Sequence, residues 1–523
     1  MTFNHNHTDT HHHSLARLAG NLIILIAVGL VAGRMALVTR LYEPATFRKA
    51  ADPGFSPAWP AARPDATPFI SSNDRSRWAT VRSLVENGTF VVARRDLDLV
   101  RATALLPLFQ TTWPGALASS GAAHRLRLAA DRGFLFEEEG WRTVDRVLDP
   151  KTLEYYSSKP PLLPTLVAGL AKPLHLLFGW KPSTHPFEIT RFILLLINLL
   201  PWWLYLAVFR DLLERLPGTD ASRLILLAMA GLGTLVQPYL IVFNNHTPGT
   251  FAVLFATAGM ARIWLATPHH PAGWIWHLST GLCAGFAVTC ELPALSFAAL
   301  IGLALVIRSP RGALTGYLLG LAAPLAALVA LNVISLGQIK PAYAEFGGPW
   351  YEYEGSSWYD PGHLKRGIDW ARRNLGESLG SYAWHLIIGH HGLFSLTPFF
   401  LLALPGAWLG LRHRQQGSGQ GLQALLGAMA MVLTIILLAF YLYKSDNYGG
   451  NCCSARWLQW LTPLLLLAAT PAVTSLMGSR SGRWCIMLLV AISVVSASAA
   501  SGNPWRRPWL YDLMKWCGWP GYE

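Results

Sequence analysis

The chain alternates long apolar runs with short polar segments, and nearly all of its charged residues lie in those polar segments. Runs such as 222–243 and 420–443 have about the ~20 residues needed to cross a ~30 Å hydrocarbon core. We therefore predict an all-α polytopic membrane protein with about eleven transmembrane helices. The predicted spans are 17–38, 188–209, 222–243, 248–266, 273–290, 293–308, 312–336, 394–411, 421–443, 456–476 and 484–500.

The first apolar run is predicted to be an uncleaved span that also serves as the targeting signal. It follows a single arginine, Arg17, and no small-residue cleavage pattern comes after it. Residues 1–16 then form a cytoplasmic, His-rich tail, for which a solvated terminus is favoured over a metal site.

The topology depends on whether the run 160–179 crosses the membrane, because every later helix would be inverted if it did. Lys172-Pro173 interrupts this run and prolines open it, so its hydrophobicity alone does not settle the question. If this run does not span and the N-terminus is cytoplasmic, the arginine clusters of four later loops lie on the cytoplasmic side, as the positive-inside rule requires. These clusters are Arg210 with Arg215 and Arg223, Arg308 with Arg311, Arg412 with Arg414, and Arg480 with Arg483. We therefore predict that 160–179 is a juxtamembrane or re-entrant helix at the outer surface.

This topology divides the chain into regions. A transmembrane module, 17–336, contains a long outer loop, 41–187, with juxtamembrane helices. A second extracytoplasmic loop, 337–393, precedes the C-terminal helices of 394–500, and an extracytoplasmic tail follows at 501–523. The cytoplasmic loops are too short for a catalytic domain, so we expect any chemistry to face outward.

Composition agrees with this assignment. The chain of 523 residues is 52% hydrophobic and 14% charged, with a net charge of +13. The basic residues are scattered through short loops, which favours membrane orientation and lipid headgroups over nucleic acid as their role. No helix–turn–helix, RNA-recognition, Walker A, dinucleotide-binding or zinc pattern is present in the sequence. A disulfide among Cys452, Cys453 and Cys517 stays open.

The segment 71–90, SSNDRSRWATVRSLVENGTF, predicts a short amphipathic helix lying on the membrane. Either Asn73 or Asp74 would serve as its N-cap, and Gly88 would end it. Asp74 is then either a cap alone or a carboxylate held beside a membrane-embedded cavity, where it takes the proton of an attacking hydroxyl. Nearby Arg75 and Arg77 would keep that carboxylate ionised.

Lys159 stands before Pro160 and Pro161 at the start of the juxtamembrane run. The predicted topology places it outside, at headgroup depth. No nucleotide pool exists on the outer side of a bacterial-type membrane, so an enzyme there draws on substrates carried in the lipid. A lysine ammonium at that depth suits the phosphate of a polyprenyl-phosphate sugar.

These two motifs resemble the membrane glycosyltransferases of the GT-C fold. An acidic residue opening a helix of the form D-x-x-R-[YW]-A after the first span, followed by K-P-P-L, is similar to the aminoarabinose (lipid A) transferases and, more distantly, to the protein O-mannosyltransferases. The resemblance covers the chain to about residue 266. It implies a polyprenyl-phosphate-sugar donor, inversion at the anomeric carbon, Asp74 as the catalytic carboxylate and Lys159 on the carrier phosphate.

The chain also departs from the family. The relatives usually have Asp-Glu where this chain has Asp74-Arg75. They commonly place a second acidic residue before a proline after the third span, where this chain reads Asn244-Asn245-His246-Thr247-Pro248. We therefore expect no metal and no cofactor.

Other residues are candidates for binding the substrates. Arg77 and Arg456 are assigned to the donor phosphate, although an arginine that snorkels at the outer end of its span is the simpler account of Arg456. Asn245, His246, His390, His391 and Tyr448 are assigned to the substrate pocket. Interfacial histidines and a flexible turn are the alternatives for the last three. Glu291 is either part of a short turn or a buried ionisable site.

The sequence hypothesis is an inverting glycosyltransferase of the bacterial inner membrane that works on the extracytoplasmic side. It moves a hexosyl or pentosyl group from a polyprenyl-phosphate-linked donor to a lipid, glycan or protein acceptor, with no nucleic acid involved. The alternative is a transporter or flippase for a lipid-linked sugar. The identity of the sugar, the acceptor and the oligomeric state stay open.

Overall fold

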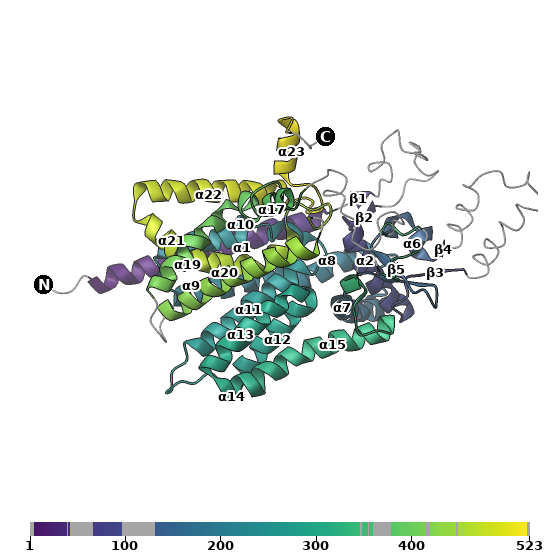
Figure 1. The fold of residues 1–523 in the computed structure, drawn as a ribbon, viewed down its shortest axis with the longest axis horizontal. Coiled ribbons are helices and arrows are strands. Elements are labelled where there is room, and N and C mark those ends of the chain that lie inside the picture. Colours follow the sequence, from purple (N-terminus) through teal and green to yellow (C-terminus); the bar gives the residue numbers. More distant parts are fainter. Residues whose placement is uncertain are drawn as a thin grey trace, which may run out of the picture. The chain divides into compact units, whose positions relative to one another are not determined.

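The computed structural model describes residues 5–38, 40–41, 66–96, 131–345, 348–353, 355–358, 378–413, 419–445 and 448–519. These residues are mostly helical, as the sequence predicted. The chain forms two compact units (Figure 1). Unit 1 comprises Met1–Leu37, Leu194–Ala327 and Ile368–Glu523, and unit 2 comprises Val38–Ile193 and Leu328–Gly367.

Six described helical segments are long and apolar enough to cross a membrane, so the chain is a multi-pass membrane protein. They are Leu15–Leu37, Pro186–Arg215, Pro310–Leu336, Gly419–Lys444, Arg456–Met477 and Arg480–Ala499. Three shorter apolar helices are Leu162–Phe178, Leu292–Arg308 and Pro398–Arg412. The count of about eleven spans stays a prediction.

Unit 1 is a bundle of helices. Its main helices are α1 (His5–Leu37), α9 (Leu200–Arg215), α10 (Asp220–Leu232), α11 (His246–Trp264), α12 (Trp274–Cys290), α13 (Leu295–Arg308), α19 (Ala403–Arg412), α20 (Gly419–Lys444), α21 (Thr462–Met477) and α22 (Arg480–Ala499). Shorter pieces are η4 (Leu195–Leu199), η5 (Gln237–Ile241), η6 (Leu292–Ala294), α14 (Pro310–Gly312), η7 (Ala313–Tyr317), α17 (Leu379–Ile387), α18 (Leu393–Leu396), η9 (Pro398–Leu402), η10 (Arg456–Leu461) and α23 (Trp509–Trp516). Helix α11 packs against α12 and α13, and the three lie side by side in Figure 1.

The predicted span 222–243 is not one continuous helix. Helix α10 ends at Leu232 with Gly233 as its C-cap, and a separate turn of 3₁₀-helix, η5, carries Pro238. Glycine and proline both weaken a helix interior, and this pair explains the break. The break sets η5 and the first residue of α11 at one end of the bundle.

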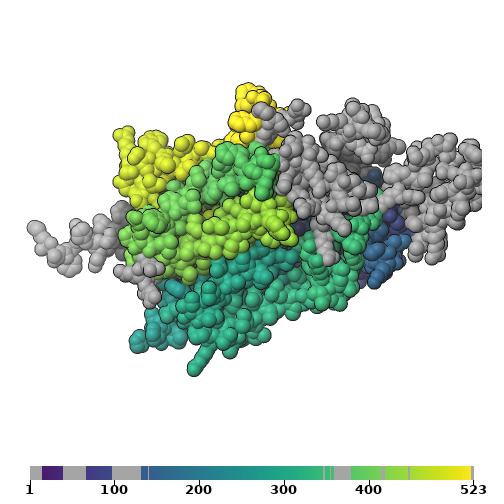
Figure 2. All heavy atoms as spheres, viewed as in Figure 1, coloured from purple at the N-terminus to yellow at the C-terminus, as the bar shows by residue number. Residues whose placement is uncertain are grey.

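Apolar side chains of unit 1 also cover its outer surface. Ile435 of α20 and Val495 of α22 are 68% and 60% exposed, and both helices form part of the face seen in Figure 2. An exposed apolar surface of this kind suits contact with lipid chains.

Unit 2 contains a four-stranded antiparallel sheet in the order β4-β3-β6-β5, which the all-α prediction did not include. Its strands are β3 (Ala93–Arg95), β4 (Asp131–Arg132), β5 (Arg146–Leu148) and β6 (Glu154–Ser157), and β1 (Arg40–Leu41) pairs separately with β2 (Ala66–Thr67). In the sheet, Ala93 is paired with Tyr155 and Arg146 with Ser157. The fully buried Val147 and Tyr351 form part of the core of this unit.

Along the chain, the helices and turns of unit 2 lie before, between and after these strands. They are α2 (Ser72–Arg82), η2 (Ser83–Asn87), α6 (Phe134–Glu137), η3 (Glu139–Trp141), α7 (Leu162–Phe178), α8 (Pro186–Leu194) and η8 (Ala342–Glu345), and α15 (Leu318–Leu336) begins in unit 1. The predicted juxtamembrane helix is α7, which ends at Gly179 with φ of 70°. It packs against α2, and Lys172 Nζ donates to the carbonyl of Val85 at 2.7 Å.

Helix α2 differs from its prediction in two ways. Its N-cap is Ser71, not Asn73 or Asp74, and the side chain of Ser71 accepts from the backbone N–H of Asp74. Its residues from Asn73 to Arg82 are all buried, so the helix is not a surface helix with one exposed face. The segment does end at Gly88, as predicted, where φ is 68°.

Candidate functional site

Asp74 lies in the first turn of α2 and is 1% exposed. Its backbone N–H donates to Ser71 Oγ at 3.1 Å, and its Oδ2 accepts from the backbone N–H of Ile70 at 3.1 Å. A carboxylate at this place also interacts favourably with the positive end of the helix dipole. The N-cap of this helix is Ser71, so the capping role predicted for Asp74 is wrong, and the carboxylate instead ties the Ile70 N–H to the first turn.

Two serines, one turn apart on α2, fasten this helix to the segment that leads to Lys159. Ser72 Oγ lies 2.7 Å from Thr143 Oγ1. Ser76 Oγ donates to the carbonyl of Asp145 at 2.5 Å and lies 2.6 Å from Ser157 Oγ. The segments that carry the two predicted catalytic residues are therefore packed together within unit 2.

Lys159 forms an ion pair with Asp145, with Nζ 2.7 Å from Oδ1. The two side chains are only 16% and 12% exposed, so the pair is largely shielded from water. The Lys159 backbone N–H also donates to Ser157 Oγ at 3.1 Å, and this bond holds the backbone from which the side chain extends. Asp145 was not predicted from the sequence, although its carboxylate lies only 14 residues before the lysine.

Arg77 is buried, and its guanidinium contacts its own helix. One amino group, Nη1, donates to the carbonyl of Asn73 at 2.9 Å and to Asn73 Oδ1. This contact holds the guanidinium beside the first turn of α2. The role of Arg77 on the donor phosphate stays a prediction.

Unit 1 brings Arg456 beside two predicted residues that are distant from it in sequence, the neighbours Asn245 and His246. His246 Nδ1 is hydrogen-bonded to Glu291 Oε1, and Asn245 Nδ2 donates to the same oxygen at 2.9 Å. Arg456 Nη1 lies 3.3 Å from His246 Nε2. We name Asn245, His246, Glu291 and Arg456 the His246 cluster.

The His246 cluster has buried charges. His246 and Glu291 are 3% and 6% exposed, so Glu291 is the buried ionisable site that the sequence analysis weighed against a simple turn. Arg456 is half-buried, with its guanidinium 4.9 Å from the ring centroid of Trp505. The carboxylate orients the imidazole: a proton on Nδ1 leaves Nε2 as the acceptor that faces Arg456.

His390, His391 and Tyr448 also come together, with His385 beside them. The ring of His391 stacks on Tyr448 at a centroid distance of 4.8 Å, and His390 stacks on His385 at 4.1 Å. Burial lowers the pKa of His391 to about 3. Burial, and then the charges of His391 and His385, also lower the pKa of His390. These histidines are therefore neutral near pH 7.

The loop after α20 connects the two clusters of unit 1. A Cβ on Gly449 would lie 3.0 Å from Arg456 Nε, so this glycine lets the loop lie directly against the arginine. Cys452 is buried in the same loop, and its thiol donates to the carbonyl of Ser454 at 3.0 Å. All six cysteines fall within the described ranges, and each is a free thiol. The described residues contain no group of three His, Cys, Asp or Glu side chains that could hold a metal ion.

No protein-family model and no curated protein matches this sequence. Among solved structures, the chain is similar to the apo oligosaccharyltransferase of Archaeoglobus fulgidus, with 10% identity and a TM-score of 0.46 over 96% of this chain and 58% of that one. It is also similar to ArnT of Cupriavidus metallidurans, bound to undecaprenyl phosphate, with 12% identity and a TM-score of 0.43 over 91% of this chain and 63% of that one. Those proteins have the GT-C fold that the sequence resembles. The chain thus spans about three fifths of the length of each.

Proposed function

We propose that this protein is an integral-membrane glycosyltransferase that moves a sugar from a polyprenyl-phosphate-linked donor to an acceptor on the extracytoplasmic side, with inversion. One observation carries the proposal: a buried carboxylate, Asp74, is fixed at the start of a helix that is hydrogen-bonded to the segment bearing Lys159. The pair supplies an anionic base and a cation for the leaving phosphate, the two groups that such a transfer needs.

Asp74 takes the role of the base. Its carboxylate accepts the proton of the acceptor hydroxyl while the hydroxyl oxygen bonds to the anomeric carbon. The bond from the Ile70 N–H holds the carboxylate in one orientation. A buried, oriented carboxylate of this kind contributes a rate factor on the order of 10²–10⁴.

Lys159 takes the role of the phosphate-binding cation. Charge builds on the bridging phosphate oxygen as the glycosidic bond breaks, and the ammonium stabilises that charge. The contact with Asp145 holds the ammonium charged and in place before the donor binds. The donor phosphate then shares the lysine with Asp145 or displaces that carboxylate.

Inversion explains why the base and the cation come from different elements. The acceptor attacks the face of the anomeric carbon opposite the leaving phosphate, so Asp74 and Lys159 must act on opposite sides of the sugar. Successive residues of a helix are about 100° apart, so Asp74 and Ser76 point to different sides of α2. Ser76, with Ser72 one turn before it, contacts the Lys159 segment, which leaves the Asp74 side for the acceptor.

The His246 cluster is assigned to substrate binding. Arg456 and Asn245 supply donors for phosphate or sugar oxygens, while Glu291 keeps the His246 ring in one orientation. His390, His391 and Tyr448 stay assigned to the pocket as neutral groups that contact sugar hydroxyls. The transferred group is a hexosyl or pentosyl unit, and the acceptor is a lipid, glycan or protein of the bacterial cell envelope. The enzyme itself is assigned to the inner membrane.

The test is label transfer by the purified protein in sealed vesicles that contain a radiolabelled polyprenyl-phosphate sugar. We expect the label to leave the carrier, release free polyprenyl phosphate and appear on an acceptor from an envelope extract. A transporter or flippase would instead move the intact lipid-linked sugar between leaflets without cleaving it. Movement without cleavage would contradict the proposal.

A further inference from the structure

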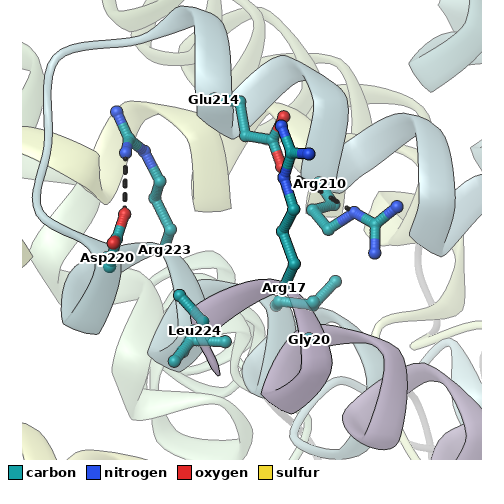
Figure 3. A pocket seen from close by; sticks show the side chains of 9 residues that line it. Arg17, Gly20, Arg210, Glu214, Asp220, Arg223 and Leu224 are labelled. Atoms are coloured by element: carbon teal, nitrogen blue, oxygen red, sulfur yellow. Dashed lines mark hydrogen bonds and ion pairs between the residues drawn. The ribbon is translucent and has the colours of Figure 1, made fainter. Parts of the chain in front are cut away.

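Unit 1 contains a pocket that the proposed transfer does not use. It has a volume of about 170 Å³ and lies where α1, α9 and α10 meet. Figure 3 shows the Arg17 side chain extending from α1 toward Glu214 on α9, with Arg210 beside them. The lining residues are Ala16, Arg17, Gly20, Arg210, Glu214, Asp220, Arg223, Leu224 and Leu227.

The pocket has an excess of positive charge. Three guanidinium groups, those of Arg17, Arg210 and Arg223, face two carboxylates, those of Glu214 and Asp220, which leaves a net charge of +1. Arg223 is held by Asp220 at 3.1 Å and by the carbonyls of Leu213 and Leu216.

The other two arginines are held less tightly. Arg210 Nη1 donates to Asn21 Oδ1 at 2.5 Å, and its Nε lies 3.9 Å from Glu214 Oε1. Arg17 is exposed at the edge of the pocket. Arg17 can therefore turn toward an incoming anion, while Arg210 adds positive charge from its place beside Asn21 and Glu214.

The pocket lies at the end of α1 remote from the His246 cluster. Arg34 Nη1 donates to Gln237 Oε1 at 2.9 Å, which places that end of α1 beside η5. Tyr239 of η5 contacts the ring of His246 at a centroid distance of 6.0 Å. Arg17 precedes Arg34 by 17 residues, or about 25 Å along a helix at 1.5 Å per residue. This separation is close to the ~30 Å thickness of the hydrocarbon core.

Lipid-facing leucines stand next to the pocket. Leu15, Leu18 and Leu22 of α1 are 60%, 65% and 54% exposed. They lie on either side of Arg17 in the segment Leu15–Leu37, which is long and apolar enough to cross a membrane. Leu224 and Leu227 add apolar surface inside the pocket. An anion bound to the arginines would thus have a route for acyl chains along α1.

We propose that this pocket binds the phosphodiester headgroup of an anionic phospholipid, in the leaflet opposite the one that contains the His246 cluster. A phosphodiester bears one negative charge, which matches the net charge of the pocket. A free phosphate bears about −1.5 to −2 near pH 7 and has no acyl chains for the exposed leucines to contact. Basic pockets between transmembrane helices on the cytoplasmic side are typical sites for anionic headgroups. The proposal does not depend on the chemistry of transfer.

The test is native mass spectrometry of the full-length purified protein, titrated with phosphatidylglycerol, with phosphatidylcholine or with inorganic phosphate. We expect phosphatidylglycerol to stay bound at concentrations where phosphatidylcholine and inorganic phosphate do not. Arg17→Gln should weaken binding about fivefold, the loss expected for one basic residue at a membrane surface. Arg480→Gln is the control, because it removes the same charge from an exposed position outside the pocket.

A second variant fills the pocket without changing its charge. A Cβ on Gly20 would meet Arg210 Cδ at 3.5 Å, an ordinary contact, so Gly20→Leu should fold and place its larger side chain in the cavity. It should reduce phosphatidylglycerol retention at least as much as Arg17→Gln. Equal retention by Arg17→Gln, Gly20→Leu and the wild type would overturn the proposal. So would binding of inorganic phosphate in preference to phosphatidylglycerol.

Discussion

At the scale of single residues, two arginines of unit 2 with largely buried side chains are each paired with one carboxylate. Arg82 makes two parallel bonds to Glu138, at 2.7 and 2.8 Å, and Arg95 does the same with Asp131, at 2.7 and 3.2 Å. Removing one partner of such a pair leaves a charge buried without compensation, which is costly. Lys159 with Asp145 belongs to this pattern, so an anionic ligand must compete with a preformed ion pair.

Replacing Lys159 by Gln should weaken binding of undecaprenyl monophosphate by about 10- to 100-fold, since a hydrogen bond to a charged group is worth about 1.5–3 kcal/mol. The measurement is a titration of the lipid into purified protein, followed by tryptophan fluorescence. Lys151→Gln, in an exposed turn of the same unit, is the matched control and should bind normally. Unchanged affinity in Lys159→Gln would remove the lysine from the phosphate site.

Acidification should destabilise the loop that carries His390 and His391. Burial holds their pKa values below the ordinary 6.5, with that of His391 at about 3, so the unfolded chain takes up protons first as the pH falls. The contribution to stability is complete above about pH 6.5 and is lost toward pH 3, at about 1.4 kcal/mol per pH unit for each histidine.

Thermal unfolding of the wild type in detergent should therefore shift to lower temperature between pH 7 and pH 5. In His391→Gln this shift should be smaller, whatever its starting stability, because one titrating group is gone. Identical pH dependence in the two proteins would mean that His391 is already protonated or solvated in the fold.

Sequence patterns singled out Asp74 and Lys159 as candidates but not Asp145, and they left Glu291 undecided. The first two stand inside short local motifs, beside a cap and before a proline pair. Asp145 directly precedes β5, and it meets Lys159 only when β5 pairs with β6 and this hairpin packs against α2. Glu291 meets His246 across 45 residues, and no local pattern encodes that distance.

At the scale of elements, close helix packing depends on glycines in unit 1. Gly281 and Gly285 of α12 face the segment from η7 into α15, where Gly316 and Gly320 occur at the same spacing of four. A Cβ on Gly281 would lie 2.1 Å from the carbonyl oxygen of Tyr317, and one on Gly320 would lie 2.2 Å from that of Leu278. Small residues at this spacing let two helices in a membrane approach closely.

Gly281→Ala should cost on the order of 1–3 kcal/mol and lower the unfolding temperature, because the backbone of η7 must move away. Gly29→Ala is the control, since nothing lies within 4 Å of a Cβ built there in α1. Thermal unfolding in detergent distinguishes the two variants. A fully stable Gly281→Ala would show that α12 and η7 are not packed in this way.

The lengths of the apolar runs predicted that the chain is mostly helical, but they predicted neither the breaks within helices nor the sheet of unit 2. The break after Leu232 follows from Gly233 and Pro238 within a run that is apolar throughout. The strands of unit 2 are two to four residues long, too short for an alternating pattern to show. The sheet is specified by contacts between distant segments, such as Ala93 with Tyr155.

At the scale of the whole molecule, the predicted topology assigns each loop between spans to one side of the membrane. It places the loop of unit 2 outside and the Arg480 turn inside. On a background without native cysteines, Asn87→Cys should react with a membrane-impermeant maleimide in intact cells, while Arg480→Cys should react only after the membrane is opened. The reverse pattern would place the proposed active site in the cytoplasm, where the donor assignment fails.

The central claim is that the Asp74 carboxylate is the base for transfer. Asp74→Asn keeps an oxygen that can accept from the Ile70 N–H, so the fold and donor binding should persist, while Ser71→Ala loses the N-cap but keeps the carboxylate. Label transfer from a polyprenyl-phosphate sugar in vesicles should fall by about 10²- to 10⁴-fold in Asp74→Asn and remain substantial in Ser71→Ala. Transfer at the wild-type rate by a folded Asp74→Asn protein would contradict the account.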